Sequence, residues 1–175
     1  MKLFLIRHAQ STNNAIWEQT HFYDDRVPDP PLTKTGRRQA EILADFLATH
    51  GEHASIGESD PHNIGGFAIT HIYCSLMERA VATGKILSVR MGLPLLAWPD
   101  IHEYGGLFSQ NTENGDRIGV EGPSRQYFET HHPELLLPQS LGSVGWWNRP
   151  HEDLPDMLIR ACQVKENILK RHKSK

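Results

Sequence analysis

The feature that most constrains this chain is the apolar run over residues 3–6, which stops abruptly at Arg7 and His8. A short run without polar residues is typical of a strand that is buried on both faces of a sheet. Polar side chains that follow such a strand lie at its carboxyl end, where open α/β sheets bind ligands. We therefore predict a central strand over 3–6, with Arg7 and His8 at a ligand site.

Composition places the chain among ordinary globular domains. Its 175 residues suffice for a single domain over 1–175, and 38% of them are hydrophobic while 22% are charged. The formal net charge of -3 argues against a nucleic-acid partner. The run over 3–6 is much too short for a membrane span or a signal-peptide core, so no membrane association is expected.

The cysteines and histidines give no sign of a metal. Cys74 and Cys162 lie far apart without CxxC spacing, and the eleven histidines are scattered without an HExxH pattern. We therefore expect no metal and no cofactor. Reduced thiols fit a cytoplasmic protein.

Periodicity predicts an α/β fold. A second buried strand is expected over 67–74, next to 3–6, and a short third strand over 93–98. Thr33 is a candidate N-cap for a helix over 34–50, whose apolar residues recur at helical spacing. Further helices are predicted over 77–91 and 156–171. The predicted architecture is a three-layer α/β/α domain with a mostly parallel central sheet.

Two further residues fall where a ligand site is expected. Arg79 lies in the first turn of the helix that follows the second strand, at the carboxyl edge of the sheet. Glu103 lies in a loop with Gly105 and Gly106, where glycines allow a close approach of the backbone to a ligand. Taken singly, each of these residues is more simply a solvated surface side chain.

The segment 109–150 is rich in Gly, Pro, Asn and His, and we interpret it as an insertion that caps the site. It carries Trp146 and Trp147. We favour core filling for both tryptophans over a role as a stacking platform.

Four short motifs, in this order, resemble the histidine phosphatase (phosphoglycerate mutase-like) superfamily. They are Arg7-His8-Ala9-Gln10-Ser11 with Asn14, Leu32-Thr33-x-x-Gly36-x-x-Gln39-Ala40, Ser75-x-x-x-Arg79-Ala80-x-x-Thr83, and Glu103 ahead of glycine. Ala9 replaces the usual glycine of the first motif. The ordered recurrence of the motifs is far less probable by chance than any one of them.

The resemblance implies a phosphoglycerate mutase-like fold and phosphoryl transfer from phosphate monoesters. It implies that Arg7, Asn14 and Arg79 bind the substrate phosphate and that His8 is the nucleophile that becomes phosphohistidine. Glu103 would start protonated and donate its proton to the leaving group. A phosphorylated small molecule is the implied substrate; phosphatase or mutase activity, the physiological substrate and a homo-oligomeric state all stay open.

The resemblance breaks at the end of the chain. In the superfamily a further buried strand follows the last helix and ends in a second histidine, whereas here the helix is followed only by a basic tail. His172 in that tail is no substitute. We expect the C-terminal strand of the family domain to be absent, through truncation rather than loss. The alternatives are a catalytically weak phospho-ligand binding domain of the same fold and, less favoured, a structural α/β module.

Overall fold

The computed structural model describes residues 1–22, 26–49, 63, 65–111 and 113–172. Three parallel strands form the central sheet in the order β1-β2-β5: β1 is Ile72–Cys74, β2 is Leu95–Ala97 and β5 is Leu135–Leu136. A separate antiparallel hairpin pairs β3 (Phe108–Gln110) with β4 (Arg117–Gly119). The predicted α/β class with a parallel sheet is confirmed.

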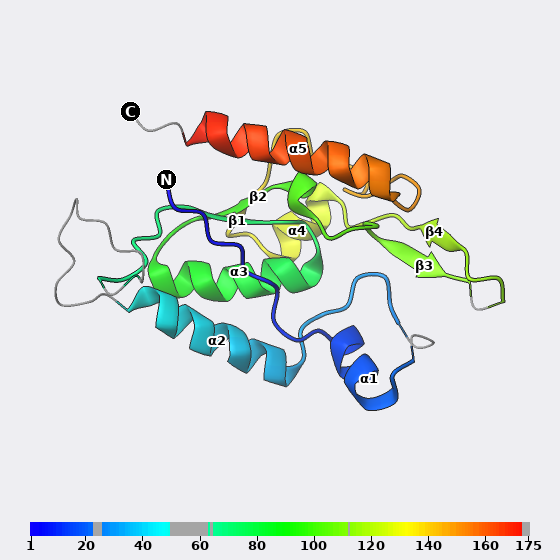
Figure 1. Cartoon of the computed structure of the whole chain (residues 1–175), viewed down its shortest axis with the longest axis horizontal. Helices are drawn as coiled ribbons and strands as arrows, with labels where there is room; N and C mark the ends of the chain where they lie inside the picture. The colour runs from blue at the N-terminus through cyan, green and yellow to red at the C-terminus, as the bar shows by residue number, and fades with distance from the viewer. Residues whose placement is uncertain (23–25, 50–62, 64, 112, 173–175) are drawn as a thin grey trace.

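Helices cover both faces of the sheet, as predicted. On one face α3 (Glu78–Met91) packs against the strands and α2 (Lys34–Ala48) packs on α3, while α5 (Leu154–Arg171) runs across the opposite face (Figure 1). The shorter elements are α1 (Thr12–Thr20), α4 (Arg125–His131) and the 3-10 helix η1 (Pro99–Ile101). Helix α1 was not predicted from the sequence.

The start of α2 shows why its motif has this form. Thr33 is the N-cap, and its side chain accepts the Gly36 N–H at 2.9 Å, as predicted. A Cβ at Gly36 would lie 2.0 Å from the carbonyl oxygen of Gln10. The glycine therefore allows α2 to approach the backbone that leads out of the His8 segment.

The core contains both tryptophans of the 109–150 segment. Trp147 is fully buried and Trp146 nearly so, which confirms their core-filling role. The ring of Trp147 lies against Gly106, where an added Cβ would be 2.1 Å from the ring and where φ is +70°. Only glycine tolerates both the short distance and the positive φ, so Gly106 allows Trp147 to pack against the loop that carries Glu103.

The strand predicted over 3–6 is wrong. This segment has no strand partner among the described residues, and Leu5 is 88% exposed. The second strand is also shorter than predicted, because only 72–74 pair with β2. Apolar character favours burial, but a strand also needs a neighbour for its backbone groups, and here a hollow separates 3–6 from β1.

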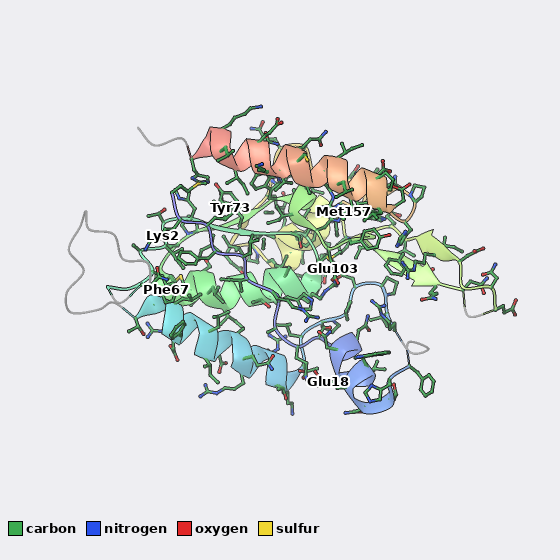
Figure 2. The ribbon with its side chains drawn as sticks, viewed as in Figure 1. Lys2, Glu18, Phe67, Tyr73, Glu103 and Met157 are labelled. Carbon is green, nitrogen blue, oxygen red and sulfur yellow. The ribbon has the colours of Figure 1, made fainter. Side chains whose placement is uncertain are left out.

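Aromatic contacts nevertheless hold the amino-terminal segment near the sheet. Phe67, which Figure 2 labels, packs edge-on against Phe4 and Phe46, with ring centroids 5.4 and 5.1 Å apart. The segment thus lies beside the chain that leads into β1, without pairing to it. Among the described residues, no helix is long and apolar enough to cross a membrane.

Candidate functional site

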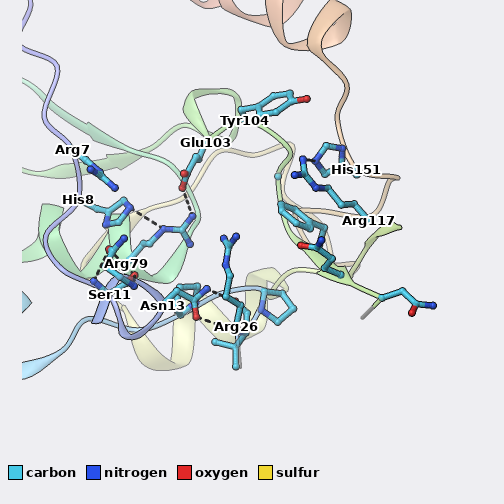
Figure 3. Close-up of a pocket in the computed structure, with 18 of the residues that line it drawn as sticks. Arg7, His8, Ser11, Asn13, Arg26, Arg79, Glu103, Tyr104, Arg117 and His151 are labelled. Carbon is cyan, nitrogen blue, oxygen red and sulfur yellow. Dashed lines mark hydrogen bonds and ion pairs between the residues drawn. The ribbon is translucent and has the colours of Figure 1, made fainter. Parts of the chain in front are cut away.

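All five predicted site residues line one cavity of about 310 Å³ (Figure 3). Arg7 and His8 end the extended amino-terminal segment, and Asn14 lies in the first turn of α1. Arg79 lies in the first turn of α3, and Glu103 follows η1. Elements that are distant in sequence therefore converge at the carboxyl end of β1.

His8 presents a nitrogen lone pair to this cavity. Its Nδ1 is 2.8 Å from the carbonyl oxygen of Ala9, and because a carbonyl can only accept, Nδ1 carries the proton. Nε2 is left to accept the Arg79 Nε–H at 3.2 Å. Burial lowers the pKa of His8, and the charges of Arg79 and Arg7 lower it further, while the Ala9 bond acts in the opposite direction. His8 is thus a neutral imidazole whose Nε2 lone pair accepts from Arg79.

Arg79 is the centre of the polar network. It is buried, and its Nη2 donates to Glu103 Oε2 at 2.6 Å while its Nη1 lies 3.5 Å from Asp29 Oδ1. The guanidinium therefore lies between His8 and two carboxylates. Glu103 is the nearer of the two carboxylates, so its removal would leave the buried guanidinium charge less well compensated.

Thr83 explains the last position of the Ser-x-x-x-Arg-Ala-x-x-Thr motif. Its hydroxyl donates to the main-chain oxygen of Arg79 at 2.8 Å and accepts the Ala9 N–H at 3.1 Å. One side chain thus joins the His8 segment to the turn of α3 that carries Arg79. This contact fixes the two groups relative to each other.

Glu103 differs from the state that the resemblance implied. Burial alone would raise its pKa, but the hydrogen bond and the charge of Arg79 outweigh burial, so the pKa of Glu103 lies below its usual value. Without a ligand the side chain is therefore a carboxylate paired with Arg79, and it does not start protonated.

Asn14 caps helix α1 and also lines the cavity. Its Oδ1 accepts from the Ser11 N–H at 3.0 Å and from the Ser11 hydroxyl at 2.9 Å, which completes a capping box at the start of α1. Because the oxygen is occupied, only the amide N–H groups of Asn14 can reach a ligand in the cavity.

Sequence reasoning missed the basic residues at the far side of the cavity. Arg26 and Arg117 lie over the ring of Phe108, at 5.9 and 5.4 Å from its centroid, and Arg117 Nη1 is 3.3 Å from His151 Nε2. Figure 3 shows Arg117 beside His151, opposite His8, with Arg26 between them. These residues belong to no local motif, and only the fold brings them together.

Asp29 was also missed, because its proline-rich surroundings indicated only an irregular connection. Its Oδ1 accepts the Glu78 N–H at 3.0 Å, at the start of α3, and its Oδ2 is buried without a hydrogen-bond partner in the described structure. Burial raises the pKa of Asp29 to about 6, although Arg79 and the Glu78 N–H oppose this shift.

Part of the chain matches the model of a known protein family. A family model described as histidine phosphatase superfamily (branch 1) matches residues 3–57, which include Arg7, His8, Asn14 and the α2 motif. The resemblance to the histidine phosphatase superfamily is confirmed. The motifs at Arg79 and Glu103 lie outside the matched residues.

Two curated phosphoglycerate mutases are similar in sequence to this histidine phosphatase-like chain. A probable phosphoglycerate mutase of Yersinia enterocolitica is 27% identical over 103 residues, covering 59% of this chain and 38% of the relative. A 2,3-bisphosphoglycerate-dependent phosphoglycerate mutase of Latilactobacillus sakei is 24% identical over 178 residues, covering 99% of this chain and 59% of the relative. The chain thus spans less than two thirds of the length of either relative.

Solved structures show the same fold. A putative alpha-ribazole-5'-P phosphatase of Escherichia coli superposes with a TM-score of 0.53 at 17% identity, over 96% of this chain and 66% of that one. The ecdysone phosphate phosphatase of the silk moth gives a TM-score of 0.51 at 15% identity, over 93% of this chain and 53% of that one. At these identities the likeness concerns the histidine phosphatase fold alone.

Proposed function

We propose that this protein transfers a phosphoryl group from a phosphate monoester to His8, as a phosphatase or a phosphoglycerate mutase-like enzyme. The observation that carries the proposal is the neutral His8, whose Nε2 lone pair lies 3.2 Å from Arg79 in a cavity that Arg7 also lines. Once a phosphate accepts the hydrogen bond from Arg79, the Nε2 lone pair of His8 is free to attack a dianion held by the surrounding cations.

Binding of the phosphate would use Arg7, Arg79 and the amide of Asn14. The two guanidinium groups are permanently charged, planar donors that match phosphoryl oxygens. They hold the phosphorus near Nε2 of His8 and stabilise the charge that spreads over the equatorial oxygens in the transition state. The arginines thus supply the positive charge at the phosphate.

The ion pair between Glu103 and Arg79 couples binding to proton transfer. When a phosphate oxygen replaces Glu103 as the acceptor of the Arg79 Nη2–H, Glu103 loses the hydrogen bond that lowers its pKa. It also acquires a dianion as a neighbour. Both changes raise the pKa of Glu103, so the carboxylate takes up a proton as substrate binds. The acid that the leaving group needs is thus formed by the substrate itself.

The reaction then proceeds in two steps. The bond from Nε2 to phosphorus forms while the bond from phosphorus to the ester oxygen breaks, and Glu103 gives its proton to the departing alkoxide. In the second step Glu103 accepts a proton from water, the water oxygen forms a bond to phosphorus, and the bond from phosphorus to Nε2 breaks, which restores neutral His8 and releases phosphate. A second phosphate acceptor in place of water would give a mutase.

The basic residues beyond the phosphate favour a leaving group that carries a second negative charge. Arg26, Arg117 and His151 face the same cavity as His8, at a distance from the phosphate-binding arginines. The curated relatives named as phosphoglycerate mutases act, by that name, on a substrate of this kind. We therefore propose a small anionic phosphate ester.

One observation favours the alternative of a weak or inactive phospho-ligand binding domain. The segment that ends in His8 has no strand partner in the described structure, so the main-chain hydrogen bonds nearest to His8 come from the residues that follow it, such as the bond from the Ala9 N–H to Thr83. A nucleophile that is loosely held binds phosphate but transfers it slowly.

The test is formation of a phosphoenzyme from para-nitrophenyl phosphate, with His8→Ala beside His131→Ala, an exposed histidine of α4 outside the cavity. The wild type and His131→Ala are expected to form an acid-labile phosphoenzyme and to release nitrophenolate, and His8→Ala to do neither. Turnover by His8→Ala would refute the nucleophile. Binding of inorganic phosphate without any phosphoenzyme would establish the binding-domain alternative.

A further inference from the structure

The side chain of Glu103 has a single hydrogen bond among the described residues. It accepts from Arg79 Nη2 at 2.6 Å and is 58% exposed, and Figure 3 shows it reaching toward Arg79 at the cavity. This donor is the one that the substrate phosphate takes in the proposed reaction. Once the phosphate is bound, the position of the carboxyl group therefore depends on the backbone that carries it.

Arg160 of α5 binds that backbone on the amino side of Glu103. Its Nη1 donates to the carbonyl oxygens of Asp100 at 2.7 Å and of His102 at 3.2 Å. Its Nε and Nη2 donate to the two carboxylate oxygens of Glu152, each at 2.6 Å. The side chains of Arg160 and Glu152 are only 13% and 8% exposed. A two-bond pair in such a dry environment fixes the guanidinium plane, and with it the direction of the Nη1 donors.

Glu152 and His102 bind the same backbone at Glu103 and beyond it. The Glu152 N–H donates to the carbonyl oxygen of Gly105 at 3.2 Å. Nδ1 of His102 lies 2.8 Å from the carbonyl oxygen of Glu103, and because a carbonyl can only accept, Nδ1 is the donor. The His102 ring is buried edge-on against Trp147, with centroids 4.8 Å apart. The backbone is thus bound on both sides of Glu103.

We propose that Arg160 is a positioning residue for Glu103. Together with Glu152 it fixes the backbone over 100–105, so that the carboxyl group stays at the leaving-group oxygen after the phosphate has taken the Arg79 donor. Arg160 does not line the cavity, so phosphate binding leaves its bonds in place. The inference rests on the proposed function, in which Glu103 is the proton donor. Proton transfer needs heavy atoms within about 2.6–3.2 Å, and a displacement of about 1 Å can cost about a hundredfold in rate.

A purely structural role for Arg160 is the competing explanation, because the same bonds attach α5 to the rest of the protein. No residue of α5 is buried, so its attachment depends on contacts of this kind. The two roles differ in their dependence on the leaving group. A displaced acid slows transfer only from esters whose alkoxide needs a proton, whereas a loosely attached helix affects all esters alike.

The experiment compares two esters of similar size in the whole protein. The leaving group of para-nitrophenyl phosphate needs no proton, whereas that of para-nitrobenzyl phosphate is an alkoxide that does. Rapid quench gives the rate of phosphoenzyme formation from each ester. Arg160→Lys keeps the positive charge but loses the planar fork that binds Glu152 and the backbone. We expect it to slow transfer from the benzyl ester by roughly tenfold or more and from the phenyl ester by less than about twofold.

Arg125→Lys is the matched control. Arg125 of α4 likewise bonds a main-chain oxygen and a carboxylate, that of Leu141 at 2.7 Å and that of Glu129 at 3.2 Å, but it lies outside the cavity and away from Glu103. We expect Arg125→Lys to leave the ratio of the two rates unchanged.

A second comparison asks whether Arg160 acts through Glu103. In a Glu103→Gln background the acid is already lost, so Arg160→Lys should cause no further loss with the benzyl ester. If Arg160→Lys does not fold, the double variant Glu152→Met with Arg160→Met replaces it, because removing both charges leaves neither one buried without a partner. The same difference between the esters is expected from the double variant.

The outcomes separate this inference from the proposed function. Equal slowing with both esters, no slowing with the benzyl ester, a further loss in the Glu103→Gln background, or the same change of ratio in Arg125→Lys would overturn the role of Arg160 alone. A wild type that forms no phosphoenzyme from either ester would overturn the proposed function, and the positioning role with it.

Discussion

Replacing Asp29 by asparagine should stabilise this protein at neutral pH. The carboxylate is 16% exposed, its Oδ2 has no hydrogen-bond partner in the described structure, and its pKa is raised from 3.8 to about 6. Asparagine can still accept the Glu78 N–H through its Oδ1. It removes a buried charge without changing the shape of the side chain.

The magnitude follows from the shift in pKa. The folded protein holds the Asp29 proton more tightly than the unfolded chain, so this group lowers stability progressively as pH rises from about 4 to about 6. A shift of roughly two pKa units corresponds to about 3 kcal/mol above this window and to roughly 0.5 kcal/mol at pH 4. Asparagine does not titrate, so the gain of Asp29→Asn over the wild type should grow across the same window.

The difference in free energy of unfolding between the two proteins is measured by urea unfolding at about pH 4.5, 5.5, 6.5 and 7.5. Asp45→Asn is the matched control: Asp45 is 63% exposed and pairs with Arg90 at the surface, so its replacement should change stability little. Destabilisation by Asp29→Asn at pH 7.5, or a gain of equal size at every pH, would refute the reasoning.

Three further outcomes are expected. Gly36→Ala should destabilise the protein by about 3 kcal/mol in urea unfolding, since its Cβ would meet the Gln10 carbonyl oxygen at 2.0 Å. Gly142→Ala, with open space around its Cβ position, should not destabilise it, and equal losses of stability would contradict the packing argument. Glu103→Gln should lose about 10²–10⁴-fold in kcat on an alkyl phosphate and far less on para-nitrophenyl phosphate, whose leaving group needs no proton, and equal losses would remove Glu103 from the acid role. Arg117→Ala should raise KM for a phosphate ester with a second carboxylate by about tenfold and leave KM for para-nitrophenyl phosphate unchanged, as steady-state kinetics with both substrates would show.

The local elements were largely predictable from the sequence. Helices α2, α3 and α5 follow from apolar residues at helical spacing, and Thr33 marks the start of α2 because its hydroxyl can accept an N–H of the first turn. The five predicted site residues also share one cavity; Arg79 and Glu103 come after β1 and β2, whose parallel pairing brings their carboxyl ends to the same edge. These properties depend on neighbours in sequence and on the topology of α/β folds.

Only the tertiary structure decided which groups those elements contact. Residues 3–6 have the composition of a buried strand, yet they lie beside a hollow, since no pattern within a strand specifies its hydrogen-bond partner. Arg26 and Arg117 join the site through a loop and a hairpin that no local motif announces. The ionised state of Glu103 depends on a guanidinium 24 positions earlier in the chain, because a pKa is set by burial and by charges that are close in space.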